Sequence, residues 1–284
     1  MMKKLLLTSY ILFSLFACKK SEPSESALNK LSQVLIGEYD NFQQCWQEHT
    51  QTDIHRVDIE TPHKHIHIVL RTAEDTQHLN FKMYEGRDSS KIIREAQWEL
   101  RENGRESQIL STHAKGQDTF ALQKLDKAYI LDLENEKWKF QGDSLIIKNL
   151  NQSTGWETDH LLLPCRFFSG WITYSLPEYP DSSFRLGDLR IHDQGGIIPL
   201  VLEDGSPTDY SVELTQLVYG RKISIMKLAV YKENFEGIHY NSQSISYTWT
   251  NPTAKRIGIN LRKVSSGWTL IEPGYVNSNN LNRN

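Results

Sequence analysis

Short segments in which apolar and polar residues alternate recur along most of this chain. Residues 65–70 read His-Ile-His-Ile-Val-Leu, and residues 79–84 form a similar return segment. Successive side chains of a strand point to opposite faces, so this period of two predicts strands with one apolar face. Turn residues separate further segments of this kind at 92–100, 107–112, 120–122, 129–133, 137–140 and 145–147. Such spacing is typical of an all-β chain that forms an antiparallel sandwich or barrel.

One helix is expected before these strands. Leu28, Leu31, Val34 and Leu35 recur at helical spacing, between Ser26 as a possible N-cap and Gly37 as a stop. We expect this helix to pack on the following strands as a lid or a plug.

The C-terminal half continues the same style with longer strands. We expect a C-terminal antiparallel meander over 184–273, separated from a barrel over 27–176 by the proline-containing segment near 177–183, and followed by a disordered tail over 274–284. Its strands are predicted at 210–219, 223–231, 244–249, 256–263 and 268–271.

The first 17 residues have the pattern of a bacterial lipoprotein signal. Two lysines precede an apolar run that ends in Leu15-Phe16-Ala17-Cys18, and the run is shorter than the roughly 20 residues that span a bilayer. Cleavage would leave Cys18 as a lipid-modified N-terminus, followed by a polar linker over 18–26. An ordinary secretory signal and an uncleaved anchor are the alternatives. Because lysines rather than an aspartate follow Cys18, we expect the outer membrane of the cell envelope.

The charge balance points to no nucleic-acid partner. The chain has 32 Lys and Arg against 35 Asp and Glu, a formal net charge of −3. The expected partner is instead the membrane, which the lipid anchor on Cys18 would reach.

Two cysteines remain beside Cys18. An exported protein lies in an oxidising compartment, so Cys45 and Cys165 are candidates for a disulfide. Two buried free thiols are the alternative, because the sequence does not give the distance between them.

Residues 35–44, Leu-Ile-Gly-Glu-Tyr-Asp-Asn-Phe-Gln-Gln, resemble the opening signature of the T-type phycobiliprotein chromophore lyases, the CpcT/CpeT family. The resemblance implies a calyx-like barrel related to lipocalins and a tetrapyrrole-like ligand. By resemblance alone it also implies lyase or transfer activity, for which a partner would supply the acceptor thiol. Asn41 and Gln44 are the matching positions. They would bind a ligand at the barrel mouth or satisfy backbone groups where the helix ends.

Histidines at 63, 65 and 67 would share one face of a strand and could collect zinc or copper. The opposite face holds Ile66, Ile68 and Leu70, so we expect the histidines on the solvated face, and no metal site. His192 and Asp193 are also adjacent, but neighbouring strand residues point to opposite faces and cannot form a relay. No cofactor or strong catalytic motif is expected.

Gln216 shares the face of a predicted strand with Val212, Leu214 and Val218. A polar group in such a row needs a partner, which is a hydrogen bond in the core or a ligand. If a calyx lies there, Gln216, Lys227 and Tyr231 are the polar groups expected to face the bound molecule.

The sequence therefore predicts an envelope lipoprotein with a calyx that binds a hydrophobic or amphipathic small molecule. A non-catalytic structural or interaction lipoprotein is the alternative.

Overall fold

The computed structural model describes residues 27–271 except 56–62, 74, 104–105, 134, 150–158, 220–222 and 233–243. The predicted signal peptide over 1–17, the predicted linker with Cys18 and the predicted C-terminal tail over 274–284 lie outside the described residues. Within the described part, no helix has the length and apolar character needed to cross a membrane.

The elements are α2 (Ala27–Leu35), β1 (Gly37–Asp40), α3 (Phe42–His55), β2 (Ile66–Thr72), β3 (His78–Glu85), β4 (Ile92–Asn103), β5 (Glu106–His113), β6 (Gly116–Leu125), β7 (Ala128–Asp132), β8 (Glu136–Gln141), β9 (Ser144–Asn149), β10 (His160–Pro164), β11 (Phe167–Tyr174), β12 (Phe184–His192), β13 (Gln194–Val201), β14 (Pro207–Tyr219), β15 (Ile223–Tyr231), β16 (Ser246–Thr250), β17 (Arg256–Leu261) and β18 (Val264–Leu270).

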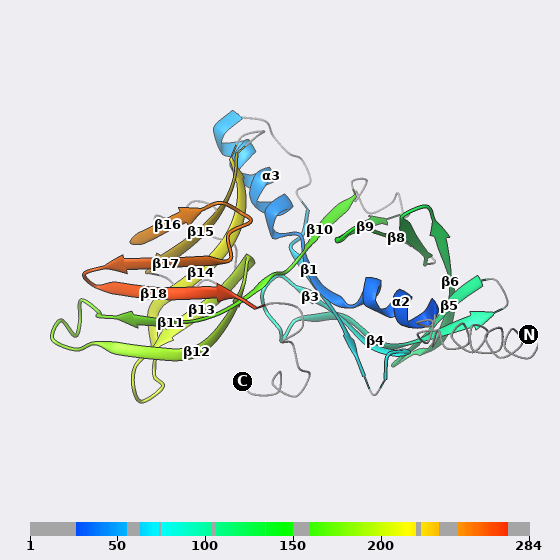
Figure 1. Ribbon diagram of the computed structural model, residues 1–284, viewed down its shortest axis with the longest axis horizontal. Helices are drawn as coiled ribbons and strands as arrows, with labels where there is room; N and C mark the ends of the chain where they lie inside the picture. Colours follow the sequence, from blue (N-terminus) through cyan, green and yellow to red (C-terminus); the bar gives the residue numbers. More distant parts are fainter. Residues whose placement is uncertain are drawn as a thin grey trace, which may run out of the picture.

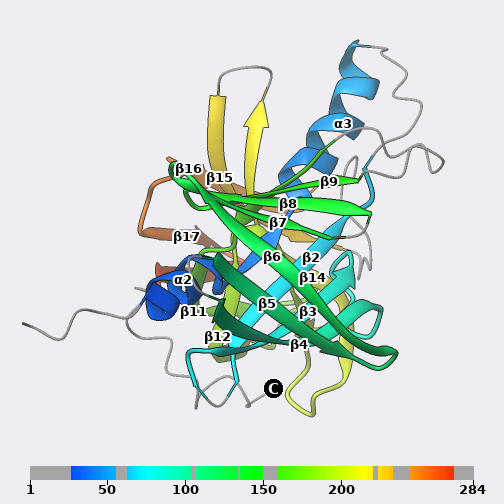
Figure 2. The same cartoon turned by 90° about the vertical axis from the view of Figure 1, so that its right-hand side faces the viewer.

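Strands β1 to β10 form a closed antiparallel barrel, which confirms the predicted fold class (Figure 1). The strands from β2 to β10 pair in sequence order, as a meander does, and Figure 2 labels β2 to β9 of this series. The short strand β1 closes the barrel, because it pairs with β2 on one side and with β10 on the other. In this register Tyr39 lies opposite Ile68 and Pro164.

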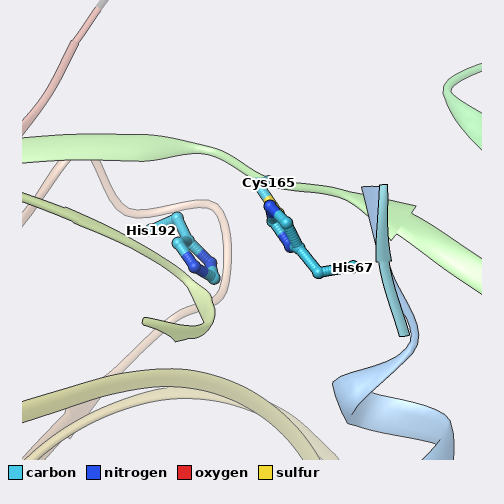
Figure 3. Close-up of side chains that lie close together, drawn as sticks. All are labelled: His67, Cys165 and His192. Carbon is cyan, nitrogen blue, oxygen red and sulfur yellow. The ribbon is translucent and has the colours of Figure 1, made fainter. Parts of the chain in front are cut away.

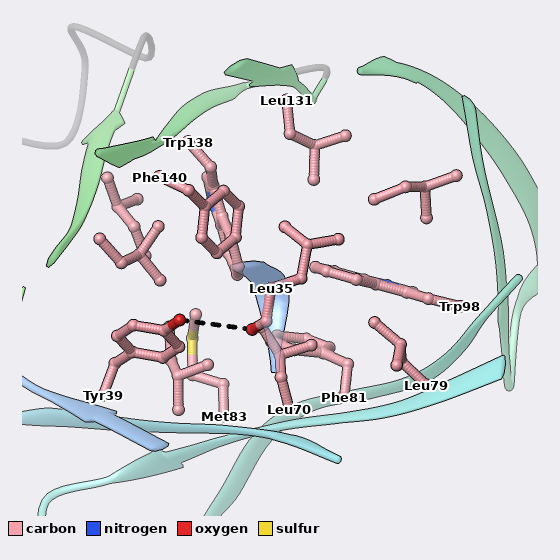
Figure 4. Packing of buried hydrophobic residues seen from close by; sticks show 14 of the residues in the cluster. Leu35, Tyr39, Leu70, Leu79, Phe81, Met83, Trp98, Leu131, Trp138 and Phe140 are labelled. Carbon is pink, nitrogen blue, oxygen red and sulfur yellow. Dashed lines mark hydrogen bonds between the residues drawn. The ribbon is translucent and has the colours of Figure 1, made fainter. Parts of the chain in front are cut away.

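Apolar side chains fill the barrel interior. Every strand of the barrel contributes buried residues to this core, and the rings of Trp138, Phe81 and Trp98 pack against one another in it, with centroids 4.9–5.9 Å apart (Figure 4). The helix α2 adds Leu31 and Leu35, which are 2% and 0% exposed within the same cluster. The helix is therefore a plug packed on the strands, as its spacing predicted.

The C-terminal strands form two four-stranded sheets that pack face to face. One sheet has the order β12-β11-β18-β17 and the other β13-β14-β15-β16. A single apolar cluster joins them, with Phe168 and Trp268 from the first sheet and Leu214 and Leu228 from the second. This is a β-sandwich, in which alternate side chains of both sheets meet in one core.

Two predictions about this half are corrected. The barrel ends at Pro164 rather than near 176, because β11 pairs with β12 and β18 and so belongs to the sandwich. The expected single meander is divided between two sheets, because β18 pairs with β11 as well as with β17. These pairings join segments far apart in the sequence, which alternation alone does not identify.

The helix α3 lies against the sandwich as well as the barrel (Figure 1). Its Phe42 and Trp46 form a small buried cluster with Leu217 of β14, and Ile225 of β15 packs against it. Strand β1 leads directly into α3, so the barrel wall and the sandwich meet at this point. The outer face of β1 and β2 is thereby brought against sheet edges of the sandwich.

Gly170 of β11 is required by close backbone approach. A Cβ at this position would lie 2.2 Å from the carbonyl oxygen of Gly267 and 2.7 Å from the Trp268 ring. We expect Gly170→Ala to lower the free energy of unfolding by about 2 to 3 kcal/mol, because backbone and a buried indole must move. Gly187→Ala on the neighbouring strand β12 is the control, since nothing lies within 4 Å of its Cβ. Urea unfolding of the two variants measures the difference, and equal losses would contradict the expectation.

Candidate metal centre at the barrel–sandwich junction

The polar face of β1 and β2 is covered rather than solvated. Glu38 and Asp40 alternate with inward residues of β1, and His65 and His67 do the same before and within β2. The side chains of His65 and His67 are only 11% and 14% exposed. The prediction that these histidines face solvent is wrong: alternation gave the correct face, but the sandwich covers it.

Asp40 is the centre of this polar cluster. Its Oδ2 accepts from Nδ1 of His67 at 2.9 Å, and its Oδ1 accepts from Nε2 of His65 at 2.8 Å and from the backbone N–H of Phe42 at 2.6 Å. Burial disfavours the charged carboxylate, but the two histidines outweigh it and hold the pKa of Asp40 far below its usual range. Asp40 therefore stays ionised and fixes both rings.

Glu38 and His67 form a second charged contact. Glu38 Oε2 lies 3.4 Å from Nε2 of His67, and its Oε1 accepts from Nη2 of Arg71 at 2.5 Å. Burial opposes both charges, but the hydrogen bonds and opposite charges prevail: they lower the pKa of Glu38 to about 2 and raise that of His67 to about 9. At neutral pH His67 is thus a cation held between two carboxylates.

His192 of the sandwich and Cys165 of the link between the two parts lie next to His67 (Figure 3). His192 ends β12, and its ring centroid lies 5.4 Å from that of His67. Its Nδ1 is buried without a hydrogen-bond partner among the described residues. Burial, together with the nearby charge of His67, lowers the pKa of His192 to about 4. At neutral pH the ring is therefore uncharged, and its free nitrogen can bind a metal ion.

Cys165 lies in the link between β10 and β11 and is a free thiol, as is Cys45. The predicted disulfide is therefore absent from the structure. The two thiols have different surroundings: the Cys45 thiol donates to the His63 carbonyl at 3.5 Å, whereas Cys165 lies beside His67 and His192. Burial and the carboxylates of Asp40 and Glu38 raise the pKa of Cys165 well above its usual range.

One ligand atom each from His67, Cys165 and His192 lies within 4.8 Å of the other two. In a tetrahedral site with metal–nitrogen bonds of about 2.0 Å and a metal–sulfur bond of about 2.3 Å, such atoms are about 3.3 to 3.6 Å apart. The three groups would thus close by roughly 1 Å around an ion. The set is a partly assembled N₂S site, with Asp40 placed as an acceptor for the ring of one ligand.

Cys165, His67 and Asp40 also follow the order of nucleophile, base and orienting carboxylate. Two observations disfavour nucleophilic catalysis. The raised pKa keeps the sulfur protonated, whereas a catalytic cysteine needs a lowered one. A cavity of about 290 Å³, which we call the junction cavity, lies between the barrel strands β1 and β2 and the sandwich strand β12. It is lined by His67 and His192 but not by Cys165. The sulfur therefore does not face the space that a substrate would enter.

The positions implied by the family resemblance have structural roles. The Asn41 side chain donates to the carbonyl of Lys64 and accepts from the N–H of Ile66, both at 2.8 Å. Gln44 joins α3 to β10, because it donates to the carbonyl of Asp159 and accepts from the N–H of Leu161, both at 3.0 Å. Both side chains thus satisfy backbone groups, but these belong to the segments that begin β2 and β10 and not to the end of the preceding helix, where they were expected.

The three polar residues predicted to face one ligand are divided between the two faces of their sheet. Gln216 points into the sandwich and donates to Oδ2 of Asp193 at 3.1 Å, so it is a hydrogen-bonded core residue. Lys227 lies on the opposite face, where its Nζ donates to the Tyr231 hydroxyl at 3.4 Å. The three cannot line one calyx. Asp193 also binds Arg166, while His192 points the other way, as alternation predicted.

Comparisons of this chain with protein-family models, with curated proteins and with solved structures found no match. The functional reading therefore depends on the geometry of the junction. The sequence patterns pointed to His67 and His192 separately, and to Cys165 only as a candidate for a disulfide. Nothing in the sequence indicated that the three would meet.

The charge of His67 predicts a pH dependence for the metal-free protein. Because the pKa is raised in the folded state to about 9, the stabilisation is complete below the ordinary value near 6.5 and is lost as pH rises through 9. We expect the free energy of unfolding to fall by an amount on the order of 2 to 3 kcal/mol across this window. Denaturant titrations of the wild type and His67→Gln measure it. A variant with the same slope as wild type would contradict the prediction, and His113→Gln, outside the junction, is the control.

Proposed function

We propose that this protein is a lipid-anchored envelope protein that binds a transition-metal ion where the barrel meets the sandwich. The observation that supports this most is the approach of three metal-binding side chains, His67, Cys165 and His192, within 4.8 Å of one another. They come from a barrel strand, the link between the two parts and a sandwich strand. The three side chains come together only when the barrel and the sandwich are both folded. A run of histidines that are neighbours in the sequence would not need this tertiary structure.

The surroundings of the three groups favour a ligand role. A buried ring nitrogen without a partner is costly, and His192 Nδ1 is such an atom among the described residues. A bound cation would satisfy it. His67 already donates to Asp40 through Nδ1, which is the carboxylate–histidine arrangement that orients metal ligands. Glu38 Oε2 lies 3.4 Å from Nε2 of His67, where it can accept the proton that the metal displaces from this nitrogen or supply an additional oxygen ligand to the ion.

The donor set defines the class of ion. Two imidazoles and one thiolate suit zinc and copper, whereas magnesium and calcium prefer oxygen ligands in larger number. Binding would displace a proton from Cys165 and one from His67, because both are protonated at neutral pH. The site would therefore bind its ion more tightly as pH rises toward 9.

Calorimetric titration of the purified protein with Zn²⁺, and with Cu⁺ under reducing conditions, tests this proposal. We expect one ion to bind per chain and Cys165→Ser to weaken binding by more than about 100-fold, since loss of an outer-shell partner alone costs 10- to 100-fold. Cys45→Ser is the matched control, because Cys45 is the other free thiol and lies outside the cluster. Absence of binding in the wild type, or an equal effect of both variants, would refute the proposal.

The envelope location and the lipid anchor belong to the same proposal and depend on residues 1–18. Palmitate labelling in a bacterial host should mark the wild type and leave Cys18→Ser unlabelled. Recovery of the wild-type chain, unlabelled, in the cytosolic fraction would exclude the anchor. It would leave the metal centre untouched, since no residue of that centre lies before Glu38.

A calyx that binds an apolar or tetrapyrrole-like molecule is the second proposal, and the family resemblance together with the closed barrel supports it. Leu31 and Leu35 of α2 occupy the barrel interior, so such a ligand would have to displace the helix. Fluorescence titration with a fatty acid and with a bilin should then show slow, saturable binding that Leu35→Asp accelerates. If neither molecule binds and no metal binds, a structural or interaction role in the envelope is favoured instead.

A further inference from the structure

A cavity of about 290 Å³ opens beside the metal-binding cluster, between the barrel and β12. His67, Glu38 and Asp40 line it from the barrel, and His192 and Arg190 line it from the sandwich. This volume lies at the lower end of the range found for small-molecule sites. The cavity is therefore large enough for a small molecule beside an ion.

Positive charge predominates on the lining. Three arginines, Arg71, Arg87 and Arg190, face the cavity, against the two carboxylates of Glu38 and Asp40. Two of the arginines have ion-pair partners, because Arg71 contacts Glu38 and Arg87 contacts Glu213 at 2.7 Å. Both lining carboxylates also have partners, because Glu38 pairs with Arg71 and Asp40 accepts hydrogen bonds from His65 and His67.

Arg190 differs from the other two arginines. No ion pair is found for it among the described residues, and its Nε is buried without a hydrogen-bond partner there. Its guanidinium carbon lies 4.0 Å from the centroid of the Phe167 ring, which holds the flat group in place. A fixed guanidinium with a buried, unbonded N–H is the arrangement that an oxyanion binds through two parallel hydrogen bonds.

Arg190 and His192 are two residues apart on the same face of β12, so their Cα atoms are separated by about 7 Å. Both residues line the junction cavity, so one small anion bound there can contact the Arg190 guanidinium and lie beside the ring of His192.

We propose that the junction cavity binds a small oxyanion, a carboxylate or phosphate group, that pairs with Arg190 and supplies an oxygen ligand to the ion held by His67, Cys165 and His192. This inference rests on the proposed metal binding. It deepens that proposal, because the natural ligand would be an ion together with an anionic molecule rather than a bare ion. Positive coupling follows, since each component binds better when the other is present.

The test uses Co²⁺ as a spectroscopic probe of coordination in the full mature protein. Inorganic phosphate and acetate are titrated separately into the Co²⁺-loaded protein, and the visible absorption bands report a new oxygen ligand. We expect saturable changes in the wild type and at least a ten-fold weaker response in Arg190→Gln. Arg190→Lys keeps the charge but loses the paired hydrogen bonds, so it should also be weaker. A response to phosphate alone, or to acetate alone, identifies which group the cavity takes.

Arg185→Gln is the matched control. Arg185 lies on the same strand and also stacks on an aromatic ring, with its guanidinium carbon 4.8 Å from the Trp171 centroid, but it does not line the junction cavity. Its replacement should leave the anion response unchanged. Thermal unfolding of each metal-free variant verifies that it is folded before the titration.

The outcomes separate the two proposals. If Co²⁺ binds and neither anion changes its spectrum, or if Arg190→Gln responds like the wild type, the anion inference is overturned and metal binding stands. If Co²⁺ does not bind, the same anions are titrated against the metal-free protein by thermal shift. Stabilisation that Arg190→Gln abolishes would keep the anion site and remove the metal, whereas no stabilisation would remove both.

Discussion

Arg87→Met is expected to lower the free energy of unfolding by about 3 to 5 kcal/mol, because it leaves a buried carboxylate without its cation. Arg87 follows β3 and crosses the junction to Glu213 of β14, with an N–O distance of 2.7 Å and side chains only 7% and 4% exposed. Burial already raises the pKa of Glu213, although Arg87 opposes the shift. Urea unfolding at neutral pH measures the loss.

Two further variants show that burial causes the effect. Arg94→Met removes a bidentate pair with Glu136 on the barrel surface, where Arg94 is 42% exposed, and should cost less than about 1 kcal/mol. The double variant Arg87→Met with Glu213→Leu removes both buried charges and should recover most of the loss. If the double variant is no more stable than Arg87→Met, an unpaired charge is not the cause.

Trp138→Ala is expected to cost about 3 to 5 kcal/mol, because it empties the centre of the barrel. Trp138 is fully buried and makes edge or tilted contacts with Phe81, Trp98 and Phe140, at centroid distances of 5.5, 5.9 and 6.5 Å. Trp249→Ala on β16 is the control, since this indole is 64% exposed and its removal should cost little. Guanidinium unfolding monitored by circular dichroism compares the two.

The same variant reports on the barrel interior. A void left by Trp138 would be lined by apolar side chains, and such cavities bind small apolar molecules. Benzene should therefore raise the unfolding temperature of Trp138→Ala and leave that of the wild type unchanged. A similar rise in the wild type would mean that the barrel already contains accessible space.

Alternation and helical spacing identified the strands β2 to β9 and the helix α2, but not the short strands β1 and β10. Residues 66–72 and 78–85 form the predicted hairpin, and Ala27–Leu35 forms the predicted helix. Helix α3 was not predicted, because its sequence is rich in glutamine, histidine and threonine and only Phe42, Cys45 and Trp46 are buried along its described face. A helix with so few apolar positions gives a weak periodic signal.

The site could be predicted only in part. The pattern around Ile66 and Ile68 placed His65 and His67 correctly on the outer face, but not what covers that face. His192 and Cys165 reach it through pairings of β11 and β12 in a different sheet. Contacts between separate sheets depend on how complete surfaces fit together, and a period of two contains no information about them.

Strand β1 has a consequence for how the molecule assembles. Its four residues are the seam that closes the cylinder between β2 and β10, and the same four residues carry Glu38 and Asp40 outward. The polar cluster therefore forms only when β1 is paired with both β2 and β10. An ion bound next to this cluster would stabilise the closed barrel, with α2 packed inside it, relative to any opened form. The stabilisation would grow with the affinity of the site for the ion.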